Sequence, residues 1–159
     1  MLYVLMAIFS AVVIAVDQIV KYLVVANIPL NTKITVVDGF FSVAYVQNTG
    51  AAFSSFQGMQ WLFALIFALF TVAVIWEFSK KRWPFTTLER WYIVAIYAGG
   101  LGNMIDRIRQ GYVVDMFTFD FIKFPVFNVA DVFITLGCLL LIIHVIFFNK
   151  AMWKEDEEQ

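Results

Sequence analysis

The sequence predicts an all-α membrane protein with four transmembrane helices and a small β-sheet at the outer membrane interface. Of the 159 residues, 62% are hydrophobic and only 14% are charged, whereas soluble domains are nearer half apolar and a quarter charged. The apolar residues form four runs too long for core helices, at about 2–25, 59–78, 91–108 and 128–148. We expect a single integral membrane domain over residues 1–159. A net charge of -1 argues against nucleic acid as a partner.

The first run has the position of a secretory signal peptide but not its composition. It lacks a basic N-terminal region, and it carries Asp17 and Lys21 with no small-residue cleavage site after them. We therefore interpret it as a transmembrane helix. The second run has Trp61 and Trp76 near its ends, where aromatic side chains anchor helices at the membrane interface. An aromatic, partly polar segment at 110–127 separates the third run from the fourth.

Residues 27–57 differ in kind from the apolar runs. Two short segments rich in β-branched and aromatic residues, KITVV and FFSVAYV, flank Asp38-Gly39. This pattern is a strong signal for a β-hairpin. Because open sheet edges are not tolerated in lipid, we expect the hairpin to lie at the interface, packed on the helix ends.

The basic residues predict the orientation of the chain. The segment 79–90 carries four Lys or Arg residues, whereas 27–57 carries only Lys33. The positive-inside rule therefore places 79–90 in the cytoplasm. Both termini are then cytoplasmic, and the hairpin and the segment 110–127 lie outside.

Several polar residues, far apart in sequence, are expected at one level of the membrane. At about 1.5 Å per helical residue, Asp17 and Asn103 lie roughly 20 Å from the inner ends of their helices, and Asp131 roughly 5 Å from its outer end. All three fall in the outer third of a hydrocarbon core about 30 Å thick. Asn103, Asp106 and Arg107 share one helix face through their i, i+3, i+4 spacing. Ionisable groups at such depth mark a functional site by default.

Most of these groups also have a purely structural interpretation. Asp17 and Lys21, four residues apart, suit an ion pair, and Asp106 with Arg107 suits a network that positions other groups. Asp115 and Asp131 are different, because neither has a basic neighbour at helical spacing and both are flanked by apolar residues. This pattern favours a functional role for the two aspartates.

Two carboxyl groups forced together at low dielectric share a proton near neutral pH. The ionised member can take a proton from water, while the protonated member hydrogen-bonds the carbonyl under attack and later protonates the leaving nitrogen. This chemistry hydrolyses an amide without a metal or a covalent intermediate. Which aspartate acts as base stays open, because a coupled pair titrates as one unit. The single His144 and single Cys138 offer neither a metal site nor an activated nucleophile near the cluster.

The chain resembles the lipoprotein signal peptidases, the bacterial signal peptidase II family of aspartic membrane proteases. The resemblance covers essentially the whole chain and rests on five elements in order, which are Asp17-Gln18-x-x-Lys21, Asn48-x-Gly50-Ala51-Ala52-Phe53, Gly102-Asn103-x-x-Asp106-Arg107, Val113-Val114-Asp115 and Phe127-Asn128-x-Ala130-Asp131. One departure is Val132, where many members have Ser.

The resemblance implies a function and a role for each matched residue. Asp115 and Asp131 would be the catalytic dyad, without metal or cofactor. The remaining matched residues would line or support the site, and these are Asn48, Gly50, Asn103, Asp106, Arg107, Asn128, Asp17 and Lys21. The substrate would be a prolipoprotein in the bacterial cytoplasmic membrane, cut on the N-terminal side of a diacylglyceryl-modified cysteine near the outer leaflet. Membrane lipid and the inhibitor globomycin would be further partners.

Two other functions stay open from the residues alone. A small proton-coupled transporter would also bury Asp and Arg residues. It should, however, carry polar residues on both sides of the midplane, and the inner halves of 59–78 and 128–148 have almost none. A non-catalytic membrane assembly factor could use the sheet as a docking surface.

Overall fold

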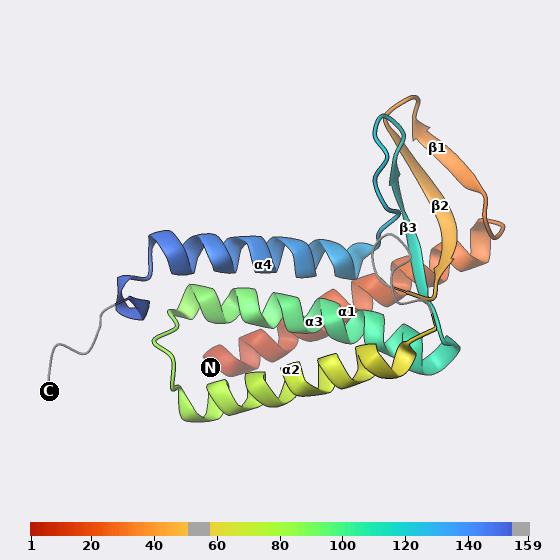
Figure 1. Ribbon diagram of the computed structural model, residues 1–159. Helices are drawn as coiled ribbons and strands as arrows, with labels where there is room; N and C mark the ends of the chain where they lie inside the picture. Colours follow the sequence, from red (N-terminus) through yellow and green to blue (C-terminus); the bar gives the residue numbers. More distant parts are fainter. Residues whose placement is uncertain (51–57, 154–159) are drawn as a thin grey trace, which may run out of the picture.

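The computed structural model describes residues 1–50 and 58–153 and shows a helical bundle with a small sheet at one end (Figure 1). The helices are α1 (Leu2–Asn27), α2 (Gln60–Lys80), α3 (Thr87–Gln110) and α4 (Val129–Phe147), and the short 3-10 helix η2 (Lys150–Met152) follows α4. Their positions agree with the four apolar runs of the sequence. Ala51, Ala52 and Phe53 of the second motif, and the tail 154–159, lie outside the described residues.

Within the described residues, three helices are long and apolar enough to cross a membrane: α1, α2 and α4. The predicted count of four spans is therefore not confirmed by length and composition. The exception, α3, is long enough at 24 residues but carries charged side chains near both ends. It is the central helix, since it packs against α1, α2 and α4, and several of its polar side chains are buried.

Glycines let α3 approach its neighbours closely. A Cβ atom built on Gly99 would lie 2.5 Å from the backbone oxygen of Ala130 in α4, and one built on Gly102 would lie 2.8 Å from the carboxylate of Asp17 in α1. Both distances are shorter than van der Waals contact. The absence of side chains at these two positions thus brings three helices together at the level of the polar residues.

The sheet is larger than the sequence predicted. Strands β1 (Lys33–Val37) and β2 (Phe41–Asn48) form the expected antiparallel hairpin, and Gly39 takes a positive φ of 66° in its turn. A third strand, β3 (Val113–Phe119), pairs antiparallel with β2, so the order is β1-β2-β3. No strand was expected within 110–127, because a single strand without a turn signal of its own has no partner in the local sequence.

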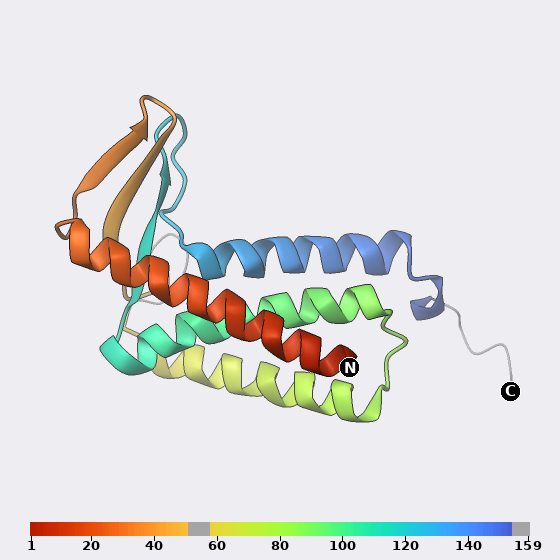
Figure 2. The ribbon, with the colours of Figure 1, turned by 180° about the vertical axis from the view of Figure 1, so that it is seen from behind.

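The sheet lies across the end of the bundle, and its strands cross the direction of the helices (Figures 1 and 2). A buried cluster joins it to the end of α1: Val24 and Ile28 pack with Tyr45 of β2 and with Val114 and Met116 of β3. Burial of these apolar side chains fixes β3, and with it Asp115, relative to the helices.

The turn at the opposite end of the bundle is shorter than predicted. Helix α2 ends at Lys80 and α3 begins at Thr87, so Arg90 belongs to a helix rather than to a loop over 79–90. A capping box explains this start: the Thr86 side chain accepts from the Glu89 N–H, and the Glu89 carboxylate accepts from the Thr86 N–H. Two N–H groups of the first turn are thereby satisfied.

We predict that Gly99→Ala destabilises the protein, whereas Gly100→Ala does not. Alanine normally favours a helix over glycine by about 1 kcal/mol. At Gly99 the new methyl group meets a backbone oxygen of α4, whereas at Gly100 it meets only the edge of the Phe67 ring, which can rotate. Overpacking at Gly99 should cost about 1–3 kcal/mol, measured as thermal unfolding in detergent. Equal melting temperatures for the two variants would contradict the close approach of α3 and α4.

Candidate active site

Asp115 and Asp131 come from different elements, and the fold brings them to one place. Asp115 lies in the middle of β3, and Asp131 lies in the first turn of α4. Asn128 connects them: its side-chain Nδ2 donates to Asp115 Oδ1 at 2.7 Å, and its backbone N–H donates to Asp131 Oδ2 at 3.1 Å. The two aspartates therefore share a hydrogen-bonding neighbour and line the same cavity.

The position of Asn128 follows from its role as the N-cap of α4. Its side-chain oxygen accepts from the Asp131 N–H at 2.9 Å, and the Asp131 carboxylate accepts from the Asn128 N–H at 3.1 Å. This capping box satisfies free N–H groups of the helix end. The same local motif that starts α4 thus orients one of the two candidate catalytic carboxylates.

Asparagine amides hold the remaining carboxylate oxygens. Asn48, at the end of β2, donates to Asp115 Oδ2 at 2.8 Å, and Asn103 of α3 donates to Asp131 Oδ1 at 2.8 Å. Each aspartate consequently accepts two hydrogen bonds from neutral groups. Neutral donors orient a carboxyl group without the full charge that would keep it ionised.

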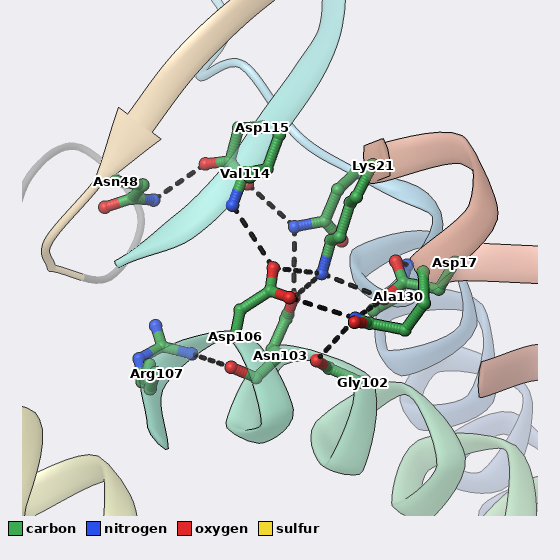
Figure 3. A network of polar contacts seen from close by, with 12 residues as sticks. Asp17, Lys21, Asn48, Gly102, Asn103, Asp106, Arg107, Val114, Asp115 and Ala130 are labelled. Carbon is green, nitrogen blue, oxygen red and sulfur yellow. Dashed lines mark hydrogen bonds and ion pairs between the residues drawn. The ribbon is translucent and has the colours of Figure 1, made fainter. Parts of the chain in front are cut away.

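Behind the aspartates, the ammonium group of Lys21 joins α1 to α3 (Figure 3). Its Nζ atom lies 2.9 Å from Asp17 Oδ2, 2.9 Å from Asp106 Oδ2 and 2.9 Å from Asn103 Oδ1. These contacts use all three donors of the ammonium group. Lys21, Asp17 and Asp106 are buried, so the pair that the sequence suggested is in fact a three-residue ion network.

Asp17 extends this network to α4. Its Oδ1 atom accepts from the backbone N–H of Ala130 at 2.9 Å, which satisfies a further N–H of the α4 N-terminus. Asp106 similarly reaches the sheet, because its Oδ2 atom accepts from the Val114 N–H at 3.3 Å. The network behind the site therefore connects α1, α3, α4 and β3 (Figure 3).

Gln18 was missed as a site residue. Its amide donates to Asp106 Oδ1 at 2.9 Å, to the Gly102 carbonyl at 3.3 Å and to Asp17 Oδ2 at 3.2 Å. The available signal was its place inside the Asp17-Gln18-x-x-Lys21 motif. Its polar side chain within an apolar run needed partners, and the packing of α1 on α3 provides two of the three.

Arg107 and Gly50 meet at the open side of the site. Arg107 donates to the Gly50 carbonyl at 3.0 Å and to the Asn103 carbonyl at 3.3 Å, and its guanidinium lies 4.4 Å from the centre of the Phe63 ring. The Gly50 N–H in turn donates to Asn48 at 2.9 Å. All ten site residues predicted from the sequence are thus connected by contacts in one region. His144 lies apart and pairs with Glu89 at 2.9 Å.

A cavity of about 790 Å³ opens beside the two aspartates. Polar groups gather at one end, including Asn48, Arg107 and both carboxylates, whereas the rest is apolar. Val132, where this chain departs from the family pattern, also lines the cavity. The apolar lining comes mainly from α2, from α4 and from β3 with the segment that follows it, and it includes Phe63, Ile66, Phe67, Phe70, Phe119, Phe124, Phe127, Ile134 and Leu136. Such a cavity fits a molecule with a polar part and a long apolar part.

The pKa of Asp115 is raised to about 6. Burial is the main cause, and the negative charge of Asp131 raises the pKa further. The hydrogen bonds from Asn48 and Asn128 and the charge of Lys21 act in the opposite direction. A carboxyl group with this pKa is present in both protonation states near neutral pH, as a general acid or base requires.

We predict that Lys21→Met strongly destabilises the protein. The variant leaves the buried carboxylates of Asp17 and Asp106 without their cation, a change that typically costs about 3–5 kcal/mol. Lys33→Met is the matched control, because its side chain is 55% exposed in its pair with Asp120, and exposed pairs contribute at most about 1 kcal/mol. The measurement is thermal unfolding of the two variants in the same detergent, and similar losses would argue against the buried network.

We also predict that Asp115→Asn changes how stability depends on pH. The folded protein keeps the Asp115 proton up to about pH 6, whereas the unfolded chain loses it near the ordinary pKa of about 4. In the unsubstituted protein, the protonated carboxyl group of Asp115 therefore stabilises the folded state fully below about pH 4, and this stabilisation is lost as the pH rises through about 6. The Asp115→Asn variant has no titrating group at this position, so it does not lose this stabilisation. Its free energy of unfolding, relative to that of the unsubstituted protein, should therefore increase by up to about 3 kcal/mol between pH 4 and 7. A difference that stays constant across this range in thermal melts would contradict the raised pKa.

Comparison with known proteins places the chain in a family. The family model for signal peptidase (SPase) II matches residues 9–147. The lipoprotein signal peptidase of Lactococcus lactis subsp. lactis (strain IL1403) is 44% identical over 133 residues, which are 82% of this chain and 85% of that protein. The lipoprotein signal peptidase of Streptococcus pneumoniae (strain ATCC BAA-255 / R6) is 41% identical over 155 residues, covering 96% and 94% of the two chains.

Solved structures agree with this assignment. Two structures described as bacterial membrane enzymes each have 28% sequence identity to this chain. One matches with a TM-score of 0.82 over 97% of this chain and 93% of that one, and the other with a TM-score of 0.80 over 90% and 93%. The interpretation as a transporter is not supported, since the family and the named relatives are peptidases. This chain is a bacterial membrane protein and belongs to the signal peptidase II family.

Proposed function

We propose that this protein removes the signal peptide from prolipoproteins, and that Asp115 and Asp131 carry out the hydrolysis. The observation that carries the proposal is that two carboxyl groups, on β3 and α4, line one cavity and are joined through Asn128. The names of the relatives support the substrate class. The scissile bond would lie on the N-terminal side of a cysteine that carries a diacylglyceryl group.

The proposed mechanism uses one proton shared by the two aspartates. The ionised carboxylate takes a proton from water, and the resulting hydroxide attacks the carbonyl carbon. The protonated carboxyl group hydrogen-bonds the carbonyl oxygen and then donates its proton to the leaving nitrogen as the C–N bond breaks. The raised pKa of Asp115 supports one shared proton near neutral pH. No step in this mechanism uses a metal ion.

The surrounding residues would orient the substrate. Arg107 already binds the Gly50 carbonyl and faces the cavity, so we propose that it holds the peptide beside the dyad. Asn48, Asn103 and Asn128 orient the carboxyl groups. Lys21 acts through Asn103, because its ammonium fixes the amide that in turn binds Asp131. It is therefore a positioning residue, as are Asp17 and Asp106.

The two-part cavity supports a substrate that keeps its lipid in the bilayer. The peptide would occupy the polar end, and the diacylglyceryl group would lie along the apolar side chains of α2 and α4. We propose that α3 completes a four-span bundle in one domain, with both termini in the cytoplasm and the site near the outer leaflet. The inhibitor globomycin would compete for the same cavity.

The test is cleavage of a purified prolipoprotein by Asp115→Asn and Asp131→Asn variants. Each substitution keeps the size of the side chain but removes proton transfer, so turnover should fall by about 10²–10⁴-fold with little change in KM. Asp120→Asn is the matched control, because this carboxylate lies just beyond β3 and binds Lys33 and Ser42 instead. Thermal melts of each variant check that the fold is intact. Normal turnover by either dyad variant would reject the mechanism.

A second substrate tests whether the enzyme requires the lipid on the cysteine. A precursor identical in sequence but without the diacylglyceryl group should be cleaved at least about tenfold more slowly, since it loses the contacts of the apolar part of the cavity. Equal rates for the two precursors would leave a peptidase but reject the lipid-modified substrate.

A further inference from the structure

The end of the sheet farthest from α1 carries an exposed aromatic cluster. We define the sheet tip as the β1–β2 turn with Phe40 and the segment 119–124 that follows β3. The Phe40 and Phe121 rings stack with centroids 5.0 Å apart, and Phe119 contacts Phe121 and Phe124 at 5.6 and 5.9 Å. The backbone N–H of Asp120 also donates to the Phe40 carbonyl at 3.0 Å. The tip is therefore a defined unit. Its rings also contact Phe127, which directly precedes the N-cap of α4, and Phe119 and Phe124 lie in the lining of the cavity.

The sheet tip exposes a large apolar surface. Phe40, Phe121, Ile122 and Phe124 remain 48–54% exposed. A contiguous apolar patch of this kind is unusual on a surface that faces water and marks an interaction site. Aromatic side chains in particular gather where a protein enters the interfacial layer of a bilayer.

The placement of the tip selects lipid as its partner. The strands cross the direction of the helices, and the tip projects past α4 to the side of the bundle (Figures 1 and 2). Helix α4 is apolar enough to cross the membrane and exposes leucine and isoleucine side chains along its length. A structure that projects sideways from the end of such a helix lies above or within the lipid beside it.

The charges around the tip are compatible with insertion but do not drive it. Asp120 turns back to the sheet, where it pairs with Lys33 at 2.5 Å and binds Ser42. Asp38 and Lys123 are the other charged residues of the turn and of the segment. The two signs balance, so attraction to anionic lipid headgroups contributes little, and binding should depend on apolar burial.

From these observations we propose that the sheet tip is inserted below the headgroups of the outer leaflet and anchors the sheet in the membrane. The anchor holds β3 from its far end, whereas the cluster around Val24 and Met116 holds it at the end near α1. Asp115 lies on the same strand, between the cluster residues Val114 and Met116. The proposal does not depend on catalysis and can be tested on inactive protein.

The test measures the depth of spin labels at the tip in lipid bilayers. With the only cysteine, Cys138, replaced by serine, a nitroxide is attached to Phe121→Cys or, separately, to Ile122→Cys. Two matched positions calibrate the result: Leu139→Cys, which is 51% exposed on α4, and Thr32→Cys, in the turn between α1 and β1. Accessibility to oxygen, which concentrates in lipid, is compared with accessibility to a water-soluble nickel chelate.

Labels at Phe121 and Ile122 should resemble the label at Leu139, with oxygen accessibility several-fold higher relative to nickel than at Thr32. The ratio should not change between low and high salt, because the binding is apolar. Nickel accessibility at both tip positions equal to that at Thr32 would overturn the proposal. Low accessibility to both reagents would also overturn it, since that result indicates cover by protein, such as a second copy of the chain. Thermal melts of the labelled variants confirm that each is folded.

Discussion

The site depends on the contacts of one buried ammonium group, that of Lys21. It lies among Asp17, Asp106 and Asn103 at 2.9 Å from each, in a place where an unpaired charge would be very costly. Through these partners it connects α1 to α3, and the two aspartates pass the connection on to Ala130 of α4 and Val114 of β3. One cation thus connects the elements that carry Asp115 and Asp131 to the helices α1 and α3.

The network is possible only because α3 is an unusual helix. It buries Asn103 and Asp106 on the side that faces α1, and it has glycine at two positions where a Cβ atom would collide with α4 or with Asp17 of α1. This polarity excludes α3 from the helices that could cross a membrane by composition alone. The same residues that make it a poor span make it the central helix, since polar groups in such a protein need partners within the protein.

The site combines two kinds of element with different roles. Helices α1 and α3 supply the ion network, whereas the candidate catalytic carboxylates sit on β3 and at the N-terminus of α4. A capping box orients Asp131, and a strand that is paired with β2 on one edge orients Asp115. This arrangement places both groups at the polar end of a cavity whose remaining lining is apolar, which is where an amphiphilic peptide can present its amide bond.

The sequence by itself determined the membrane class, the positions of the helices and the β1–β2 hairpin. These follow from local patterns, which are long apolar runs and an Asp-Gly turn. The candidate site residues came from buried charged groups and from the resemblance to a family, and their roles stay a proposal. Only the tertiary structure decided that β3 joins the sheet, that Lys21 binds Asp106 of α3 in addition to its i, i+4 partner Asp17, and that Gln18 belongs to the network. The physical reason is that each of these depends on a partner far away in the chain, and local sequence does not specify which distant group satisfies a buried donor or an open strand edge.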